Sequence, residues 1–341
     1  MLTLIHKVKS LSRKSVIRFP TFLKFFDKYS KKFEKGEKLI LRIGIDLGGS
    51  HIGVGLIYKD KILDTRQKNF LDSDKVNIRK TIVESAVSMT KDILKSQGIS
   101  KNDIDLLGIA SPGLIDSRSI VKASNLSLEN FCLTEELENK IKMRVKIRND
   151  AKCCALAEKK YGSLKKYKDC LFLCIGTGIG GAAFINGKLL EPNGFSGFEF
   201  GHMIIEKDGR PCTCGKKGCF EQYASISAIK KRVTKILGER PDVSGQYLRE
   251  NLLIKDNPLV QLEVESWLNY LKIGIGNLID IFEPEAICFG GSFSHYEGNP
   301  ILDRLIKKLG DPDTTFTTSK QPDIVLAKYK NDSGMIGATI I

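Results

Sequence analysis

The chain has 341 residues, 42% of them hydrophobic and 28% charged, and its formal net charge at pH 7 is +14. This length suffices for two domains of ordinary size, and no apolar run approaches the ~20 residues that a membrane-spanning helix needs. An odd number of cysteines, nine, and the lack of a secretory signal speak against a disulfide framework. We therefore expect a reducing compartment, the cytoplasm.

The positive charge is concentrated at the start of the chain. Residues 1–40 hold eleven lysines and arginines against three acidic residues, or +8 of the +14. Because the rest of the chain is only mildly basic, we expect no nucleic-acid partner. Aromatic residues at helical spacing from Thr21 to Phe33 predict an amphipathic helix in a basic N-terminal extension, residues 1–38. Packing or disorder, weak contact with a membrane or another polyanion, and a transit peptide stay open as interpretations of this extension.

Residues 39–148 are predicted to form a first α/β domain. The expected elements in chain order are strands at 39–46 and 53–58, a helix at 78–97, a strand at 105–110, a helix at about 134–143 and a strand at 144–148.

Residues 149–341 begin with a similar order and are predicted to form a second α/β domain. The expected elements are a helix at 151–161, strands at 170–175 and 182–185, an apolar helix at 271–282 and a buried strand at 283–289. Both domains contain two strands joined by a glycine turn, which suggests a ligand held between two related domains.

These two glycine turns, residues 46–50 and 176–181, are candidate phosphate sites. Glycine lets backbone N–H groups approach an anion, and a carboxylate at a strand end holds hydrated Mg²⁺. Neither turn fits the P-loop pattern, and each alone is equally well explained as a tight hairpin turn. Taken together they favour a nucleotide phosphate. The nucleotide-binding candidates are Asp46, Gly48, Gly49, Ser50, Gly176, Thr177, Gly178 and Gly180.

A third glycine pair, Gly290 and Gly291, follows the strand at 283–289 and joins these candidates. Gly274 and Gly276 in the preceding helix let it approach either an adenosine or a neighbouring helix. The residues alone do not separate these two interpretations.

One imidazole and three thiols lie within eighteen residues, from His202 to Cys219. Zn²⁺ prefers four tetrahedral nitrogen or sulfur ligands, and a closed Cys₃His set is typical of a structural site. The predicted ligands are His202, Cys212, Cys214 and Cys219, with Gly215 and Gly218 letting the loop bend around the ion. Unligated thiols on a surface loop are the alternative. The glycine turns are expected to lie elsewhere.

Three carboxylates have two interpretations each. Asp150 follows Asn149 at a strand end and leads into a helix, where it is either an N-cap or the base that accepts a hydroxyl proton in phosphoryl transfer. Glu199 and Glu221 flank the cysteine loop, either solvated or accepting hydrogen bonds from sugar hydroxyls.

In this order the motifs resemble the ROK family (repressor, open reading frame, kinase) over about residues 41–341. The matching stretches are Asp46-Leu47-Gly48-Gly49-Ser50, Asn149-Asp150-Ala151, residues 176–181, Glu199-Phe200-Gly201-His202, Cys212-Thr213-Cys214-Gly215 and Gly218-Cys219-Phe220-Glu221. The resemblance implies an actin-like ATPase (ribonuclease H-like) fold, with two α/β domains around a central cleft, a homodimer, and an ATP-dependent hexose kinase.

The resemblance also implies residue roles. Asp150 is the catalytic base, and the sugar contacts are Gly113, Asn125, Asn149, Glu199, His202 and Glu221. His202 then ligates zinc through one ring nitrogen and touches the sugar through the other. Ser50 stands where threonine is commoner, and residues 126–131 replace the family's proline-glycine-tryptophan stretch.

Because that stretch helps to select the sugar, the substrate stays open. Glucose is expected as the family's commonest substrate, with N-acetylmannosamine, N-acetylglucosamine, fructose and allose as alternatives. The family also contains sugar-responsive repressors, which carry a winged helix-turn-helix of roughly 60–80 residues ahead of this region. With 40 residues before Leu41 and a candidate base at Asp150, a kinase is expected.

Overall fold

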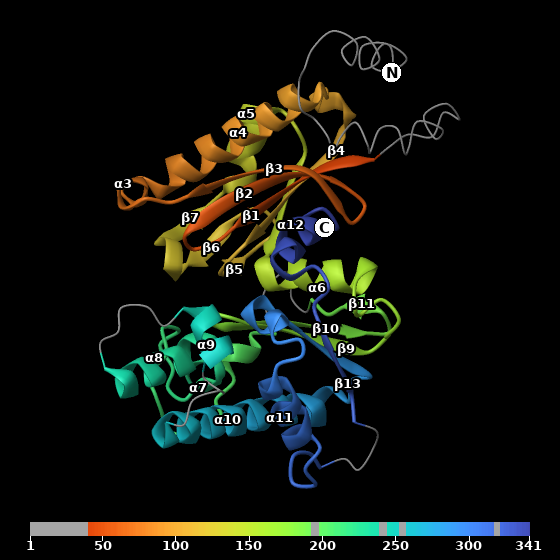
Figure 1. Cartoon of the computed structure of the whole chain (residues 1–341). Helices are drawn as coiled ribbons and strands as arrows, with labels where there is room; N and C mark the ends of the chain where they lie inside the picture. Colours follow the sequence, from red (N-terminus) through yellow and green to blue (C-terminus); the bar gives the residue numbers. More distant parts are fainter. Residues whose placement is uncertain (1–39, 192–197, 239–243, 252–256, 317–320) are drawn as a thin grey trace. The chain divides into compact units, whose positions relative to one another are not determined.

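The computed structural model describes residues 40–191, 198–238, 244–251, 257–316 and 321–341 (Figure 1). The chain divides into two compact units. Unit 1 comprises residues up to Cys153 together with Gly334–Ile341, and unit 2 comprises Cys154–Ser333. The predicted ranges 39–148 and 149–341 stay a prediction. The compact units place the last eight residues with the first segment of the chain. The predicted helix at residues 21–33 lies outside the described residues.

Unit 1 contains a five-stranded sheet of order β3-β2-β1-β4-β8 and a small sheet of order β5-β6-β7. Its elements are β1 (Leu41–Leu47), β2 (His51–Tyr58), β3 (Lys61–Asn69), α3 (Asp72–Lys75), α4 (Ile78–Gln97), η1 (Lys101–Asp103), β4 (Ile104–Ser111), β5 (Leu114–Ile115), β6 (Ile120–Ala123), η2 (Ser124–Leu126), β7 (Leu128–Phe131), α5 (Leu133–Ile141), β8 (Val145–Asn149) and, at the C-terminus, α12 (Ser333–Ala338). Strands β1, β4 and β8 run parallel, while β2 is antiparallel to β1.

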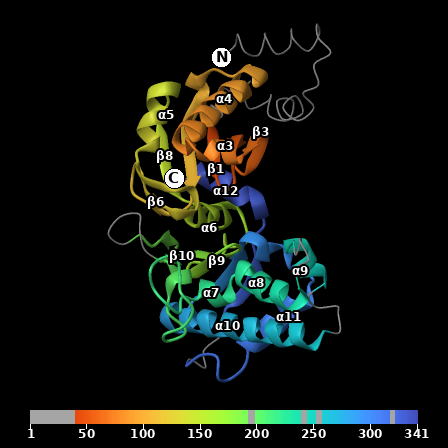
Figure 2. The ribbon, with the colours of Figure 1, turned by 90° about the vertical axis from the view of Figure 1, so that its left-hand side faces the viewer.

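The two faces of this sheet are covered differently because side chains alternate along a strand. On β1, Ile43 and Ile45 are buried in a core shared with α4 and α5, which cover one face in both views (Figures 1 and 2). Gly44 and Asp46 point to the other face, where the backbone of α12 lies. A side chain at Gly44 would clash with the Met335 carbonyl, and one at Gly108 on β4 would clash with that of Ala338. Glycine therefore lets α12 lie directly on the strands.

Unit 2 contains a sheet of order β11-β10-β9-β12-β13 and most of the remaining helices. The elements after β8 are α6 (Asp150–Tyr161), in which the boundary between the units falls, β9 (Cys170–Ile175), β10 (Ile179–Ile185), β11 (Lys188–Leu189), η3 (Phe200–His202), α7 (Glu221–Ala224), α8 (Ile226–Leu237), α9 (Gly245–Asn251), α10 (Pro258–Phe282), β12 (Ala286–Gly290), η4 (Gly291–His295), α11 (Pro300–Leu309), β13 (Asp323–Leu326) and η5 (Lys330–Asp332). Strands β9, β12 and β13 run parallel.

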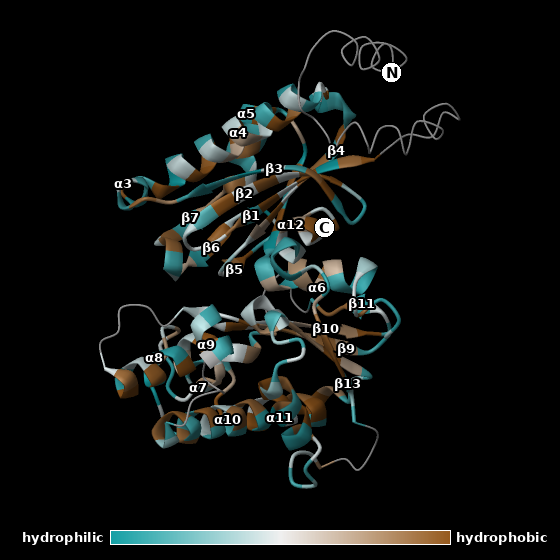
Figure 3. Cartoon of the chain, in the orientation of Figure 1, coloured by the Kyte–Doolittle hydropathy of each residue, from teal (hydrophilic) through white to brown (hydrophobic). Residues whose placement is uncertain are grey.

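Strand β9 again separates two cores by alternation. Leu171 and Leu173 join the core that includes Trp267 of α10, and Phe172 joins a second one with Ala155 of α6. The strands of this sheet are mostly brown, hydrophobic, in Figure 3. Strands β9 and β12 are almost entirely buried, as is usual for parallel strands between helices.

Most of the predicted elements are present, but one begins earlier than expected and several others were not predicted. Helix α10 begins at Pro258, thirteen residues before the predicted start at Leu271. Asn257 caps it by accepting hydrogen bonds from the backbone N–H of Leu259 (3.1 Å) and of Val260 (3.3 Å). This Asn-Pro pair is a helix-start signal that the sequence analysis missed. The elements that were not predicted are strands β3, β5–β7, β11 and β13 and helices α3, α7–α9, α11 and α12. None of the helices among the described residues is long and apolar enough to cross a membrane.

Candidate functional site

Asp46 and Asn149, two predicted site residues of unit 1, lie at the carboxyl ends of parallel strands. Asp46 of β1 pairs with Ala110 of β4, and Ser111 of β4 pairs with Asn149 of β8. In parallel α/β sheets this edge is where ligands bind. Residues far apart in the sequence thus lie at one edge.

The first glycine turn joins β1 to β2 and is closed by a 2.9 Å hydrogen bond from the Gly48 N–H to the His51 carbonyl. Two neighbours of Asp46 were not among the predicted site residues. The His51 Nε2 lies 4.0 Å from the Asp46 carboxylate, and Gly334 at the start of α12 packs so closely that a Cβ there would lie 2.7 Å from Asp46 Oδ1. His51 directly follows the turn motif and could have been noticed. Gly334 carries no such signal.

Asn149 links the end of β8 to Gly113. Its side-chain amide donates a 3.1 Å hydrogen bond to the Gly113 carbonyl, and its Oδ1 accepts one of 3.3 Å from the Lys152 N–H. Helix α6 begins at Asp150, and the Asn149 side chain caps its first turn through this bond to the Lys152 N–H. Both interpretations of Asp150 stay predictions. Its half-buried carboxylate accepts a 2.7 Å hydrogen bond from the Ala151 N–H, among other interactions.

Gly113 and Asn125 lie close to these residues. Gly113 has φ of +89°, which favours glycine, and packs against Ala123 of β6. Asn125 is exposed, and its amide would lie 2.9 Å from a Cβ at Gly49 of the first turn. Unit 1 thus brings together the first glycine turn and the predicted sugar contacts Gly113, Asn125 and Asn149.

In unit 2 the second glycine turn lies beside the third glycine pair. Gly176 directly follows β9, and its N–H donates a 2.9 Å hydrogen bond to the Gly178 carbonyl. Gly290 ends the neighbouring parallel strand β12, and Gly291, with φ of +64°, lies against Cys174. The carboxyl ends of β9 and β12 thus place both predicted glycine segments together.

Helix α10 uses its glycines for packing against protein. A side chain at Gly274 would clash with the Phe220 ring, and a Cβ at Gly276 would lie 2.6 Å from the Thr314 carbonyl oxygen. These contacts favour the helix-packing interpretation of both glycines.

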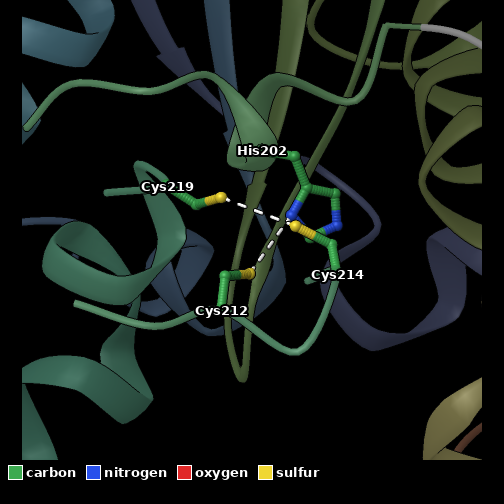
Figure 4. Close-up of side chains that lie close together, drawn as sticks. All are labelled: His202, Cys212, Cys214 and Cys219. Atoms are coloured by element: carbon green, nitrogen blue, oxygen red, sulfur yellow. Dashed lines mark hydrogen bonds between the residues drawn. The ribbon is translucent and has the colours of Figure 1, made fainter. Parts of the chain in front are cut away.

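The four predicted zinc ligands converge in unit 2. The side chains of His202, on η3, and of Cys212, Cys214 and Cys219 point toward one another (Figure 4). Their ligand atoms all lie within 4.8 Å of one another. The Cys212 sulfur is 3.6 Å from His202 Nδ1, and the Cys214 and Cys219 sulfurs are 3.6 Å apart. Tetrahedral Zn²⁺ with bonds of about 2.3 Å places its sulfur ligands roughly 3.8 Å apart, so this donor set fits zinc.

The cysteine loop is held by its own backbone. The Cys212 N–H bonds to the Lys216 carbonyl at 2.8 Å, and Gly218 N–H to the Arg210 carbonyl at 2.8 Å. Gly215 and Gly218 have φ of +90° and +79°, which explains why glycine is required at both bends.

The thiols differ in their pKa values. Burial raises the pKa of Cys219 to about 12, with hydrogen bonds to Cys214 and Cys212 adding to it. Burial also raises the pKa of Cys212. At the exposed Cys214 burial acts upward too, but hydrogen bonds, led by that from the Lys216 backbone, lower its pKa. Because a metal binds thiolates, loading this cluster releases protons.

Glu221 connects the cysteine cluster to the second glycine turn. Its Oε1 accepts a 3.2 Å hydrogen bond from the Cys212 thiol and lies 3.7 Å from His202 Nδ1. Its Oε2 would lie 2.7 Å from a Cβ at Gly178. The expectation that the glycine turns lie elsewhere is therefore wrong for this turn. Glu199, by contrast, is exposed just before η3, and its carbonyl accepts a 2.9 Å hydrogen bond from the His202 N–H.

Comparisons with known proteins place the chain in context. Residues 42–341 match the ROK family. A glucokinase of Thermotoga maritima is 30% identical over 319 residues, covering 88% of this chain and 96% of that protein. A xylose repressor of Bacillus spizizenii is 31% identical over 262 residues, covering 76% of this chain and 66% of the repressor.

A similar solved structure is a ROK family glucokinase from Streptomyces griseus in complex with glucose and AMPPNP. It superposes with a TM-score of 0.73 at 24% identity, covering 87% of this chain and 97% of that one. The likeness shows the fold, so the protein has the predicted actin-like ATPase fold.

Proposed function

The chain belongs to the ROK family, and on that premise we propose that it is an ATP-dependent hexose kinase of the glucokinase type. The observation that carries this proposal is the position of Asp150, which begins α6 directly after β8, at the carboxyl end of the parallel strands. A carboxylate at the carboxyl end of a parallel strand is suited to be a base, because ligands bind at that edge of the sheet.

Phosphoryl transfer needs little covalent chemistry from the protein. The sugar hydroxyl oxygen attacks the γ-phosphorus of ATP, the bond to the β–γ bridging oxygen breaks, and ADP leaves. Asp150 accepts the hydroxyl proton. The products are a sugar phosphate, ADP and the proton on the carboxylate.

The nucleotide contacts are proposed for the glycine segments. In unit 1 these are Gly48, Gly49 and Ser50, with Asp46 holding the hydrated Mg²⁺ that neutralises phosphate charge. In unit 2 they are Gly176, Thr177, Gly178, Gly180, Gly290 and Gly291. Their support is the position of each turn at the carboxyl end of a strand.

The sugar contacts are proposed for Gly113, Asn125, Asn149, Glu199, His202 and Glu221. Carboxylates and amides suit a hexose because each accepts or donates hydrogen bonds to hydroxyls. Glucose is the first choice, and the named relative from Thermotoga supports it. N-acetylmannosamine, N-acetylglucosamine and fructose are the alternatives.

A structural zinc ion is proposed for His202, Cys212, Cys214 and Cys219, because their donor atoms converge. The His202 Nδ1 faces the Cys212 sulfur, which leaves Nε2 as the nitrogen for the sugar. The ion would fix the segment that carries both His202 and Glu221.

The similarity to a xylose repressor supports a second candidate, a sugar-binding regulator without turnover. Against it, the similarity covers nearly the whole of the glucokinase and about two thirds of the repressor. Calorimetry separates the two functions, since a regulator binds sugar without consuming ATP.

The test is a panel of glucose, N-acetylmannosamine, N-acetylglucosamine, fructose and xylose with Mg²⁺-ATP, followed by coupled ADP release. The proposal expects sugar-dependent ADP release with glucose at the highest kcat/KM. Sugar binding with no ADP release from any hexose would overturn it. The expected homodimer is checked by light scattering on the same preparation.

A further inference from the structure

The second glycine turn lies against a carboxylate rather than open space. The position of a Cβ on Gly178 would be 2.7 Å from Glu221 Oε2, closer than any normal contact of a Cβ. At Gly176 in the same turn, the nearest atom to such a Cβ is the Ser292 hydroxyl at 3.7 Å, an ordinary distance. The space beside Gly178 is thus occupied by a carboxylate, whereas the space beside Gly176 would accept a methyl group.

We propose that Gly178 is a positioning residue for the sugar, because its bare backbone seats the Glu221 carboxylate. This rests on the proposed function, in which Glu221 contacts the sugar. Gly178 was predicted only as part of a phosphate turn. The proposal gives it a second role that links the phosphate turn to sugar recognition.

The backbone does not require glycine at residue 178. Its φ is outside the left-handed region that favours glycine, unlike that of Gly215 or Gly218 in the neighbouring loop. A side chain at residue 178 is therefore opposed by a steric clash and not by the backbone conformation. The atom in the way is the far end of a glutamate, which moves at little cost to the fold.

Glu221 is nevertheless held on its other side. Its side chain is 15% exposed, and Oε1 accepts a hydrogen bond from the Gln222 amide (3.3 Å). A methyl group at residue 178 would therefore shift Oε2 relative to this partner. A misplaced acceptor loses hydrogen bonds to the substrate without unfolding the protein.

Unit 1 repeats this arrangement. A Cβ on Gly49 of the first turn would lie 2.9 Å from the amide nitrogen of Asn125, another proposed sugar contact. Asn125 is exposed, so it has room to move aside. We expect the same relationship there with a smaller effect.

The experiment compares Gly178→Ala with Gly245→Ala, at the start of α9, in the purified full chain. Gly178→Ala is expected to raise KM for the sugar, and the calorimetric Kd for sugar without ATP, by about tenfold. Gly245→Ala, where a Cβ meets no atom within 4 Å, is expected to leave both sugar constants within about twofold. Zinc content and thermal unfolding should match the wild type in both variants, which excludes a folding defect.

Rescue tests the contact itself. Glu221→Asp is one methylene shorter, so in the Gly178→Ala background it makes room for the methyl group. The double variant is expected to bind sugar more tightly than the product of the two single effects predicts. Strictly independent effects would overturn the proposal, as would an unchanged sugar Kd in Gly178→Ala.

Glu221→Gln separates this inference from the proposed function. If it weakens sugar binding while Gly178→Ala does not, the positioning role is wrong and the role of Glu221 stands. If Glu221→Gln leaves sugar binding unchanged, its assignment as a sugar contact is wrong, and the positioning role fails with it.

Discussion

The Asn149 side-chain amide donates to the Gly113 carbonyl while its oxygen caps α6, so one side chain fixes both a loop and the first turn of a helix. Asp150 is the next residue. The capping interaction of Asn149 therefore helps to place the Asp150 carboxylate.

Replacing Asp150 by Asn should lower kcat by about 10²–10⁴-fold, because general-base catalysis contributes that much. The amide keeps the shape of the carboxylate, so the calorimetric sugar Kd should change little. Asp92→Asn, on the exposed surface of α4, is the control. Near wild-type turnover in Asp150→Asn would remove this residue from the proposed mechanism.

Replacing Cys214 by Ser, or prolonged chelation, should release about one zinc ion per chain. Sugar affinity should fall because the segment with His202 and Glu221 loses its anchor. Since Glu221 also lies against the second glycine turn, KM for ATP should rise in parallel. Metal analysis before and after the change measures the ion, with Cys132→Ser as the control. Native protein that contains no zinc would rule this out.

Glu158 is completely buried and accepts hydrogen bonds from two backbone N–H groups, those of Ser163 and Tyr329, each at 2.9 Å. In Glu158→Gln one donor faces an NH₂ group instead of an oxygen. We expect a loss of about 2–4 kcal/mol in the free energy of unfolding, measured with urea. The exposed Glu84→Gln should cost almost nothing. Equal unfolding midpoints for the two variants would contradict this assignment.

Asp64 should make stability depend on pH. Burial raises its pKa, but hydrogen bonds from Arg66 and Gln97 outweigh this and hold the pKa below 3.8. A lowered folded-state pKa contributes stability that is present above the unfolded value and lost as the pH falls through the folded one. The difference in unfolding free energy between wild type and Asp64→Asn should therefore be constant above about pH 5 and narrow below it. A difference that grows in acid would contradict the sign.

Deleting residues 1–38 should leave kinase activity largely intact, because none of the proposed phosphate, sugar or zinc residues lies there. Co-sedimentation with anionic vesicles tests the membrane interpretation of this segment. If full-length and truncated protein both stay in the supernatant, that interpretation is wrong. Lost activity or solubility on truncation would place the segment within the fold.

Helix bounds and the cysteine cluster could be predicted from the sequence, because both depend on the spacing of residues that are close together in the chain. Helix α4 matches its predicted bounds, since its apolar periodicity runs between Asn77 as N-cap and Gly98 at φ of +63°. The cysteine cluster is predicted for the same reason, with three of its four ligands in one loop.

Contacts between distant segments were not predicted. Gly178 meets Glu221, and Gly334 meets Asp46, only because strands and turns bring them together. Strands β5–β7 are two to four residues long, too short for a clear alternation. Register and helix packing decide these features, and no spacing along the chain encodes them.

The packing of α12 against Gly44 and Gly108 also has a consequence for the order of folding. The last eight residues pack on β1 and β4, yet they are made after the whole of unit 2. Unit 2 is one continuous segment, so all of its residues have been synthesised before the last eight residues are made. Unit 1 begins first, but the second face of its sheet is covered only after the last eight residues have been synthesised. Removing a few residues from the C-terminus is therefore expected to leave the second face of the unit 1 sheet uncovered.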